Sequence, residues 1–453
     1  MNRAAAGFRV TFLLLLSGMA VSQGRAPYPN AVTDREIHPE SPMPVPARNL
    51  VSVDPDFGSL IVRASDETTN AFPNGYLRNS GSGEANAWNA NSTMFYATGQ
   101  GGRPYIFGFR PATMRVVSPV NPNSDAPLAL PLRPDPTFSA TDPDLIYGTT
   151  AVRPLAIQSY RISTGAVNTV VDGVTCGTRP AIAQSSLSDD SVSISADDRR
   201  LANSMGGRKS GDHPFLIVYD KVLGCRWYNT ETGEIGGEWG VVGSASTSDR
   251  FLIRHPYISK SGKYVVILVN NAGFYVWNIR TTNVQACTTV NSAMRCHGYG
   301  AVGFNSYVNA AGLLDQMNIV ERSLASISSV TPLVWPLDPP HYFGQTKHFT
   351  WANANSDDTA PLCGSTYTYD GDPEIDSPYN GEIFCVETDG RASTVWRFAH
   401  NRALWVDPYF QTQPLGDVSR DGRFFLFTST WNGELGRQSN GTPRSDVFVL
   451  KLK

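Results

Sequence analysis

The sequence predicts an all-β protein: a seven-bladed β-propeller of four-stranded antiparallel blades, closed into a ring by a strand from the N-terminal part of the chain. Short strands rich in aromatic and aliphatic residues recur over most of the 453 residues, and 40 glycines and 31 prolines supply turns between them. The strands fall into seven similar units, the pattern typical of a propeller. A β-sandwich is the alternative fold, but it does not explain the repetition.

The phrase around which the repeats are organised is residues 416–428, which read GDVSRDGRFFLFT, although the fourth unit is the clearest as a whole. We interpret this phrase as a short strand, a tight turn on Asp421 and Gly422, and a second, buried aromatic strand. An Asp-Gly pair favours the positive φ angles that a two-residue hairpin turn needs. The phrase recurs well in residues 259–269 and more loosely in residues 195–204.

The same strand–turn–strand rhythm defines an innermost strand in every unit. The seven expected innermost strands are residues 87–91, 137–141, 192–195, 256–259, 300–304, 348–352 and 415–419. The seventh unit has only three strands before the chain ends at residue 453. We therefore expect residues 50–63 to supply the missing strand and remove an exposed sheet edge.

The N-terminal segment has the features of a secretory signal peptide over residues 1–22. Arg3 and Arg9 give a positive start, residues 10–16 form an apolar centre, and small residues precede cleavage after Ala20 or Ser22. An uncleaved anchor is the alternative, although the apolar run is short for a bilayer. Residues 23–49 form a proline-rich arm and residues 50–453 the propeller. The protein is expected to be secreted or periplasmic.

Charge and cysteine content narrow the functional classes. The formal net charge of −3 argues against nucleic-acid binding, which needs a basic face. No segment after the signal peptide is expected to span a membrane, and we expect a monomer with a carbohydrate or protein ligand. Six cysteines suit an oxidising compartment. Proximity in the sequence favours the pairs Cys287–Cys296, Cys363–Cys385 and Cys176–Cys225, although six cysteines allow 15 connectivities.

The phrases SRDGRFFLFTS and SKSGKYVVILV resemble the S-x-D-G-[KR]-x-[ILV]-x-[FY] signature of TolB-type and other WD40-like (PD40-type) propeller repeats. As architecture, the resemblance covers residues 87–453. It implies the propeller fold, but such propellers bind, scaffold and catalyse alike, so it implies no reaction.

Three histidines lie at or just before the start of innermost strands: His255, His297 and His348 in units four to six. In unit seven, Gln411 and Gln413 occupy the matching place. The starts of inner strands surround one mouth of the central channel. Neutral imidazoles and an amide oxygen that converge there could bind a divalent metal, Mn²⁺ or Ca²⁺, or exchange protons. The alternative is a structural role for each histidine.

This arrangement resembles oligogalacturonate lyases, secreted or periplasmic seven-bladed propellers that bind manganese through three His and one Gln. The resemblance implies that His297, His348 and Gln413 are metal ligands and that His255 is the catalytic base or a further ligand. The chain departs from that pattern because no histidine lies near Gln413 in the sequence.

Other residues carry weaker signals. Four aromatic side chains in loops could stack on sugars or pack between blades: Tyr342, Trp405, Tyr409 and Trp431. Residues 370–376 alternate acids and glycine, as in a calcium loop or a solvated hairpin tip. Three functions stay open: a ligand-binding protein with an oligosaccharide or protein at the funnel mouth, a metal-assisted polysaccharide or oligouronide lyase, and an extracellular protein-interaction scaffold.

Overall fold

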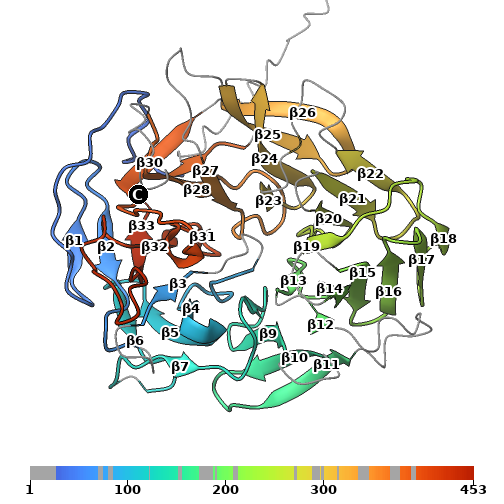
Figure 1. Cartoon of the computed structure of the whole chain (residues 1–453), viewed down its shortest axis with the longest axis horizontal. Coiled ribbons are helices and arrows are strands. Elements are labelled where there is room, and N and C mark those ends of the chain that lie inside the picture. Colours follow the sequence, from blue (N-terminus) through green and yellow to red (C-terminus); the bar gives the residue numbers. More distant parts are fainter. Residues whose placement is uncertain are drawn as a thin grey trace, which may run out of the picture.

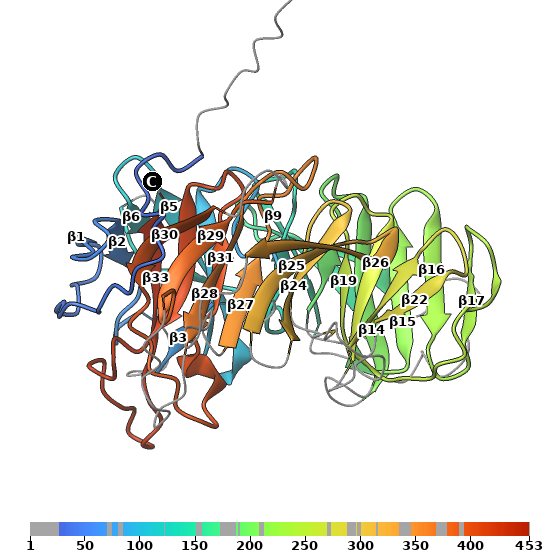
Figure 2. The same ribbon diagram turned by 90° about the horizontal axis from the view of Figure 1, so that it is seen from above.

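Seven antiparallel sheets surround a central axis in this computed structural model (Figure 1). It describes residues 27–69, 75–79, 85–121, 123–150, 156–172, 187–188, 191–207, 213–269, 273–287, 296, 300–313, 316–334, 346–367, 378–388 and 394–452. Figure 2 shows the ring from the side, with the strands running between its two faces. The predicted seven-bladed propeller is confirmed.

Blades 1 to 3 occupy the N-terminal half of the ring. Blade 1 contains β3 (Leu77–Arg78), β4 (Met94–Gly99), β5 (Pro104–Arg110) and β6 (Arg115–Val117), with β7 (Leu128–Ala129) beside β5. Blade 2 contains β8 (Thr137–Phe138), β9 (Leu145–Thr149), β10 (Ala156–Arg161) and β11 (Val167–Asp172). Blade 3 contains β12 (Leu187–Ser188), β13 (Ser193–Ile194), β14 (Arg200–Gly207), β15 (Phe215–Asp220), β16 (Gly224–Asn229), β17 (Glu234–Gly237) and β18 (Gly243–Ser244).

Blades 4 to 7 complete the circle. Blade 4 contains β19 (Ile253–Ile258), β20 (Tyr264–Val269), β21 (Phe274–Asn278) and β22 (Val284–Cys287). Blade 5 contains β23 (Gly300–Val302), β24 (Ser306–Leu313), β25 (Gln316–Ser323) and β26 (Ser326–Val334). Blade 6 contains β27 (Thr346–Thr350), β28 (Leu362–Tyr367), β29 (Glu382–Val386) and β30 (Val395–His400). Blade 7 contains β31 (Gly416–Val418), β32 (Phe424–Ser429), β33 (Asp446–Lys451) and, from the N-terminal part, β2 (Leu60–Arg63).

The ring is closed by β2, as the sequence predicts. Ile61 pairs with Leu450 and Val62 with Val449, antiparallel to β33. Arg63 Nε donates to Asp446 Oδ2 at 2.9 Å, so a buried ion pair joins the two strands. A further strand, β1 (Val51–Val53), pairs with the outer side of β2. The N-terminal strands therefore cover what would otherwise be an open edge.

The repeated turn has a physical cause in its serine. Ser419 Oγ accepts hydrogen bonds from the backbone nitrogens of Arg423 and Phe424 at 3.2 and 3.0 Å, and donates to Asp421 Oδ1 at 2.7 Å. Ser259 in blade 4 accepts the corresponding two bonds. Gly422 has φ of 70°, a conformation that glycine adopts without strain. The serine thus satisfies the backbone of the turn while glycine reverses the chain.

Several predicted strand limits differ from the structure. β19 begins at Ile253 instead of residue 256, so His255 lies inside the strand and not before it. In blade 1 the predicted strand 87–91 is reduced to a bridge between Trp88 and Phe95, and β3 pairs with the other end of β4. The strands β7, β17 and β18 were not predicted.

The described part of the arm, residues 27–49, packs along blades 6 and 7. Val32 forms a bridge with Arg397, and the Tyr28 ring meets Trp396 and Phe398 edge-on at 5.5 and 5.1 Å. The Arg397 side chain is fully buried and pairs with both Glu382 and the arm's Asp34. The arm is therefore anchored to the propeller by a buried charge and by aromatic contacts.

Two predicted disulfides are confirmed. Cys287, the last residue of β22, is bonded to Cys296 with a Cα–Cα distance of 5.5 Å. Cys363 and Cys385 face each other across β28 and β29 and are bonded with a Cα–Cα distance of 3.9 Å. Cys225 is also disulfide-bonded, whereas Cys176 lies outside the described residues. In the described parts of the chain, no helix is long and apolar enough to span a membrane.

Candidate functional site at the central funnel

The strands nearest the axis define the two ends of a central funnel. We call the end where these inner strands begin the mouth, and the end where the serine-containing turns follow them the turn end. His348 lies in β27, and Gln413 ends the short helix η3 (Phe410–Thr412) just before β31. Ser365, which pairs with His348, donates to the carbonyl of Pro414 at 2.5 Å. The mouth-side segments of blades 6 and 7 are thus in direct contact.

His348 is held as a neutral imidazole. Burial lowers its pKa from the usual 6.5 to about 4, although a hydrogen bond to the backbone of Gly416 acts in the opposite direction. Its Nδ1 is buried and has no hydrogen-bond partner. A neutral ring with an unused nitrogen can coordinate a metal, bind a ligand hydroxyl or exchange a proton.

Aromatic and amide groups lie in the segments next to β27, where Tyr367 pairs with Thr346. Tyr367 Oη donates to Gln413 Oε1 at 3.4 Å, and the Tyr367 ring meets Trp405 edge-on at 5.3 Å. The exposed Phe410 ring has the Arg78 guanidinium above it at 5.5 Å. The mouth near blades 6, 7 and 1 therefore offers an amide and aromatic surface to a ligand, whereas the Arg78 guanidinium is paired with Asp135 at 3.1 Å.

The remaining predicted site residues are placed as follows. His255 is partly buried in β19 on blade 4, with its ring parallel to that of Tyr257 at 6.3 Å. His297, Tyr342 and residues 370–376 lie outside the described residues. The convergence of His255, His297, His348 and Gln413 stays a prediction. Among the residues that the structure describes, no three His, Cys, Asp or Glu side chains group as a metal site.

Of the predicted loop aromatics, two lie near the mouth and one lies in the core. Tyr409 is partly buried and directly precedes η3, next to the exposed Phe410. Trp405 is 8% exposed. Trp431 is 1% exposed, stacks on Phe448 at 4.8 Å and donates to the carbonyl of Met43 at 2.8 Å. Of the two roles offered for the loop aromatics, stacking on sugars and packing in the protein, the contacts of Trp431 correspond to packing.

The turn end of the funnel is crossed by two cations that the sequence analysis did not single out. Lys260 Nζ in blade 4 donates to Asn86 Oδ1 in blade 1 at 3.4 Å. Arg420 in blade 7 donates to the carbonyl oxygens of Ala352 in blade 6 and Ala140 in blade 2 at 2.7 and 3.4 Å. Both side chains are buried. These bonds join blades on different sides of the axis, so this end is closed by charged side chains.

A sequence signal for these cations does exist. Lys260 and Arg420 each follow the serine of the repeated turn, at the position that Ala140 and Ala196 occupy in blades 2 and 3. A long cation in place of alanine at a position next to the axis indicates a side chain that crosses the channel. The repeat pattern alone does not reveal this position, because the turn has the same pattern whether alanine or a cation follows the serine.

Asp417 lies between these cations. Its Oδ1 accepts from Thr350 Oγ1 at 2.5 Å and its Oδ2 from the backbone nitrogen of Ala87 at 2.9 Å, which links blade 7 to blades 6 and 1. Burial raises the pKa of Asp417 to about 7, while these bonds and the charges of Lys260 and Arg420 oppose the rise. Burial likewise lowers the pKa of Arg420 to about 10.

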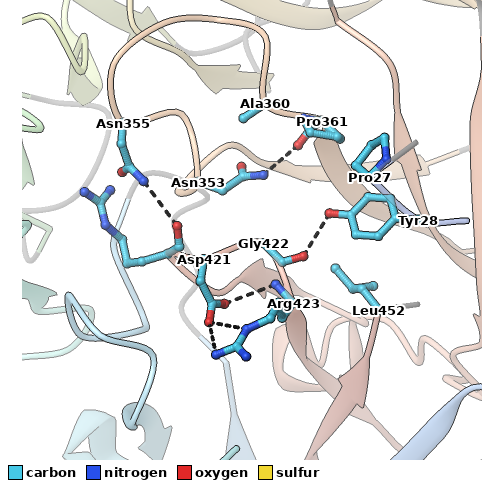
Figure 3. Close-up of a pocket in the computed structure, with 11 residues that line it drawn as sticks. Pro27, Tyr28, Asn353, Asn355, Ala360, Pro361, Asp421, Gly422, Arg423 and Leu452 are labelled. Atoms are coloured by element: carbon cyan, nitrogen blue, oxygen red, sulfur yellow. Dashed lines mark hydrogen bonds and ion pairs between the residues drawn. The ribbon is translucent and has the colours of Figure 1, made fainter. Parts of the chain in front are cut away.

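A cavity of about 380 Å³ opens on the same face as the turns, between blades 6 and 7 (Figure 3). Its walls come from the arm at Tyr28, from the long loop after β27 at Asn353 and Asn355, and from the turn at Asp421 and Arg423. It lies at the opposite end of β27 and β31 from His348 and Gln413.

Comparison with known proteins supports the fold. An oligogalacturonate lyase from Vibrio parahaemolyticus superposes with a TM-score of 0.56 at 11% identity, covering 89% of this chain and 96% of the lyase. An oligogalacturonate lyase in complex with manganese gives 0.55 at 13% identity, covering 90% and 97%. TolB from Acinetobacter baumannii gives 0.32 at 13% identity over 53% and 51%. No family model matches the sequence, and no curated protein matches it. At such identities the likeness to the lyases shows the fold alone.

Proposed function

We propose that this chain binds an oligosaccharide at the mouth of the funnel, with His348 and Gln413 as its polar contacts. The neutral imidazole of His348, whose Nδ1 is buried and lacks a partner, carries the proposal. Buried polar atoms in proteins are nearly all hydrogen-bonded, so an unused nitrogen beside a funnel suits a ligand. Gln413, Tyr367 and Trp405 add an amide and aromatic surface, which are common in sugar sites.

The charges at the turn end favour an acidic oligosaccharide. Arg420 is 7% exposed and bonds to carbonyl groups, and Lys260 is 4% exposed. Charges in a low-dielectric interior act over longer distances than charges in water. Two cations across the closed end would therefore make the funnel attractive to a sugar carboxylate that enters from the mouth.

A metal-assisted lyase that acts on uronides is the second candidate function. It is favoured because two chain-length structural matches are described as oligogalacturonate lyases, one of them with manganese. The residues fit such a metal, because His348 Nδ1 is unpartnered and Gln413 Oε1 is an amide oxygen. His348 and Gln413, together with the predicted ligand His297, would hold it. The metal would neutralise the uronate carboxylate.

In this second function His255 would be the base. It would take the proton from the carbon next to the carboxylate, and the bond from the adjacent carbon to the leaving sugar oxygen would break. The electron pair of the C–H bond would become the new double bond, and the leaving oxygen would receive a proton. An unsaturated uronide and a shorter oligosaccharide would result.

Isothermal titration of the mature protein with trigalacturonate tests the binding proposal, with the neutral methyl ester of the same trisaccharide for comparison. We expect trigalacturonate to bind more tightly than the ester, and His348→Ala and Gln413→Ala to weaken binding by about tenfold or more. His38→Ala, a change in the arm, is the matched control and should bind like the wild type. Equal binding by wild type and His348→Ala would contradict the proposal.

Two measurements separate the second function from simple binding. Metal analysis after incubation with Mn²⁺ alone should find the metal in the wild type and not in His348→Ala. Incubation with trigalacturonate should then yield an unsaturated product that His255→Ala does not form. A wild-type protein that binds trigalacturonate without Mn²⁺ and never cleaves it would exclude the lyase and retain the binding protein.

The location of the protein outside the cytosol belongs to the same proposal. Residues 1–22 carry the features of a signal peptide, and the two disulfides are typical of oxidising compartments. Fractionation of the native host should find the protein in the periplasm or the medium, starting at residue 21 or 23. A scaffold function would instead be indicated by a protein partner that His348→Ala still binds.

A further inference from the structure

We propose that the cavity on the turn face between blades 6 and 7 is a second binding site, for one or two rings of a neutral sugar. The site is distinct from the mouth. Gln413 precedes β31 and Asp421 follows it, so the two places are separated by the length of a three-residue strand, about 10 Å at 3.3 Å per residue. The proposal does not depend on the function assigned to the funnel.

The cavity contains a buried acceptor without a partner. Asn353 is 8% exposed, and its Nδ2 donates to the carbonyl of Pro361 at 3.0 Å. Its Oδ1 has no hydrogen-bond partner. Figure 3 shows this amide between the loop that carries Asn355 and the turn that carries Gly422. A ligand hydroxyl would satisfy an oxygen that the protein leaves unused.

The rim adds further acceptors that are already oriented. Asn355 Nδ2 donates to the carbonyl of Arg420 at 3.2 Å, which fixes the amide and leaves its oxygen for a ligand. Burial raises the pKa of Asp421, but hydrogen bonds from Ser419 and Arg423 outweigh this and hold the pKa below its usual value. Arg423 Nε donates to Asp421 Oδ2 at 2.6 Å. Asp421 is therefore an ionised acceptor whose charge is balanced by its neighbour.

The walls of the cavity combine polar groups with well-packed apolar side chains. Tyr28 is 6% exposed, its ring packs edge-on against Trp396 and Phe398, and its hydroxyl donates to the carbonyl of Gly422 at 2.9 Å. Pro27 and Pro361 line the cavity beside it. A sugar ring has apolar faces and polar edges, so it matches apolar walls with acceptors at the rim.

Charge and size select the ligand class. Asn353 Oδ1 and the carboxylate of Asp421 present acceptors to the cavity, so the site suits a ligand that donates hydrogen bonds. Arg420 and Arg423 at the cavity disfavour a cation, while Asp421 disfavours an anion. A neutral polyol remains. A volume of about 380 Å³ lies near the lower end of the usual range for small-molecule sites and suits one or two sugar rings.

Saturation-transfer NMR with cellobiose, maltose, lactose and xylobiose tests this site on the full mature protein. Ala360→Phe should fill the cavity, and the backbone carbonyl of Ala360 would still accept from Trp351 and Thr388. Ala325→Phe, at the exposed tip between β25 and β26, is the matched control. We expect at least one disaccharide to bind wild type and Ala325→Phe, and to lose at least about tenfold in affinity with Ala360→Phe.

Two further variants test whether the disaccharide binds in this cavity and not at the mouth. Asn355→Ala removes an exposed amide with little risk to folding and should also weaken binding. His348→Ala should leave this binding unchanged, because it alters only the mouth. The proposal is overturned if none of the four disaccharides binds, if binding survives Ala360→Phe, or if it is lost with His348→Ala, which would assign the sugar to the mouth.

Discussion

The two ends of the funnel are built in different ways. At the turn end, the same serine-containing turn recurs, its hydroxyl bonds to its own backbone, and buried groups such as Asp417 tie neighbouring blades together. At the mouth, the described residues come from segments that share no motif, such as η3 and the start of β27. His348 even keeps a buried nitrogen without a partner.

This difference indicates which end stabilises the fold and which end keeps polar groups available to a ligand. A turn whose backbone is satisfied internally can repeat around a ring and hold each blade to the next. A binding end needs unsatisfied groups, and these differ from blade to blade because each contacts a different part of the ligand. Stability changes should therefore follow the turn end and the closing strand, whereas binding changes should follow the mouth.

Removal of residues 1–63 should have the largest effect, because it deletes β2 and leaves β33 with an open edge. We expect the truncated protein to lose its cooperative unfolding transition and to self-associate, because blades 7 and 1 meet where the ring closes. Circular dichroism melting and light scattering measure this. A shorter deletion of residues 1–26 is the control and should melt like the mature protein. A folded monomer without residues 1–63 would contradict the role of β2.

Asp417→Ala should have the next largest effect and act on the turn end. It leaves the Ala87 nitrogen and the Thr350 hydroxyl buried without an acceptor, at a cost of about 1–3 kcal/mol each. We expect the free energy of unfolding to fall by roughly 2–5 kcal/mol in urea titrations. Asp417→Asn retains an acceptor oxygen and should lose less. Equal losses in the two variants would show that the carboxylate charge, not its hydrogen bonds, holds the blades.

The two disulfides whose cysteines are both described sharpen the comparison because one lies at each end. Cys287–Cys296 closes a separation of 9 residues after the end of β22, and Cys363–Cys385 one of 22 residues near the start of β28. Loop entropy predicts losses of about 2.6 and 3.4 kcal/mol when each pair is changed to alanine. We expect urea titrations to find the larger loss for Cys363 and Cys385, and trigalacturonate binding to change only with the other pair. The reverse pattern would contradict the assignment of stability to the turn end.

The smallest effects concern pH, and they have opposite signs at the two ends. Between about pH 4 and 7 the folded protein keeps a proton on Asp417 that the unfolded chain has released, so stability from this group falls as pH rises. Over about pH 4–6.5 the unfolded chain protonates His348 while the folded protein does not, so stability from that group rises with pH. Each slope is at most about 1.4 kcal/mol per pH unit.

Unfolding titrations of two variants across this window separate the slopes. Relative to wild type, Asp417→Asn should gain stability as pH rises, because the opposing slope is removed. His348→Ala should lose stability as pH rises. Metal or ligand binding requires a neutral His348. An unperturbed histidine becomes protonated below about pH 6.5, but His348, with its lowered pKa, should stay neutral and keep binding down to about pH 4. Slopes of the same sign in both variants would contradict this account.

Local patterns made much of the fold predictable. The expected strands 145–149, 167–172 and 446–451 match the observed limits, because alternation and turn residues act over a few positions. The disulfide pairs followed from short separations along the chain. The strand β2 was found because a three-stranded seventh unit requires a partner. Each of these inferences rests on neighbours in sequence or on a count of strands.

Contacts between distant segments were not predictable in the same way. Lys260 reaches Asn86 across the ring, and Arg420 reaches Ala140, and these contacts depend on the width of the channel, which no local pattern encodes. His348 was expected to open its inner strand but is the third residue of β27, and its lowered pKa depends on how blades 6 and 7 pack around it. The turn-face cavity needs the arm, a loop and a turn together, so it also escaped sequence analysis.

The pairing of β2 with β33 also determines when the ring can close during synthesis of the chain. A ribosome makes Ile61 near the beginning of synthesis and Leu450, its partner, near the end. Six blades can form while the chain grows, but the seventh has no outer strand until both halves of the pair exist. Closing so long a loop is slow, and the edge of β2 that faces β33 must stay unpaired until then. Completion of the ring thus reports that synthesis has passed β33, and a chain truncated before β33 cannot produce a sealed propeller.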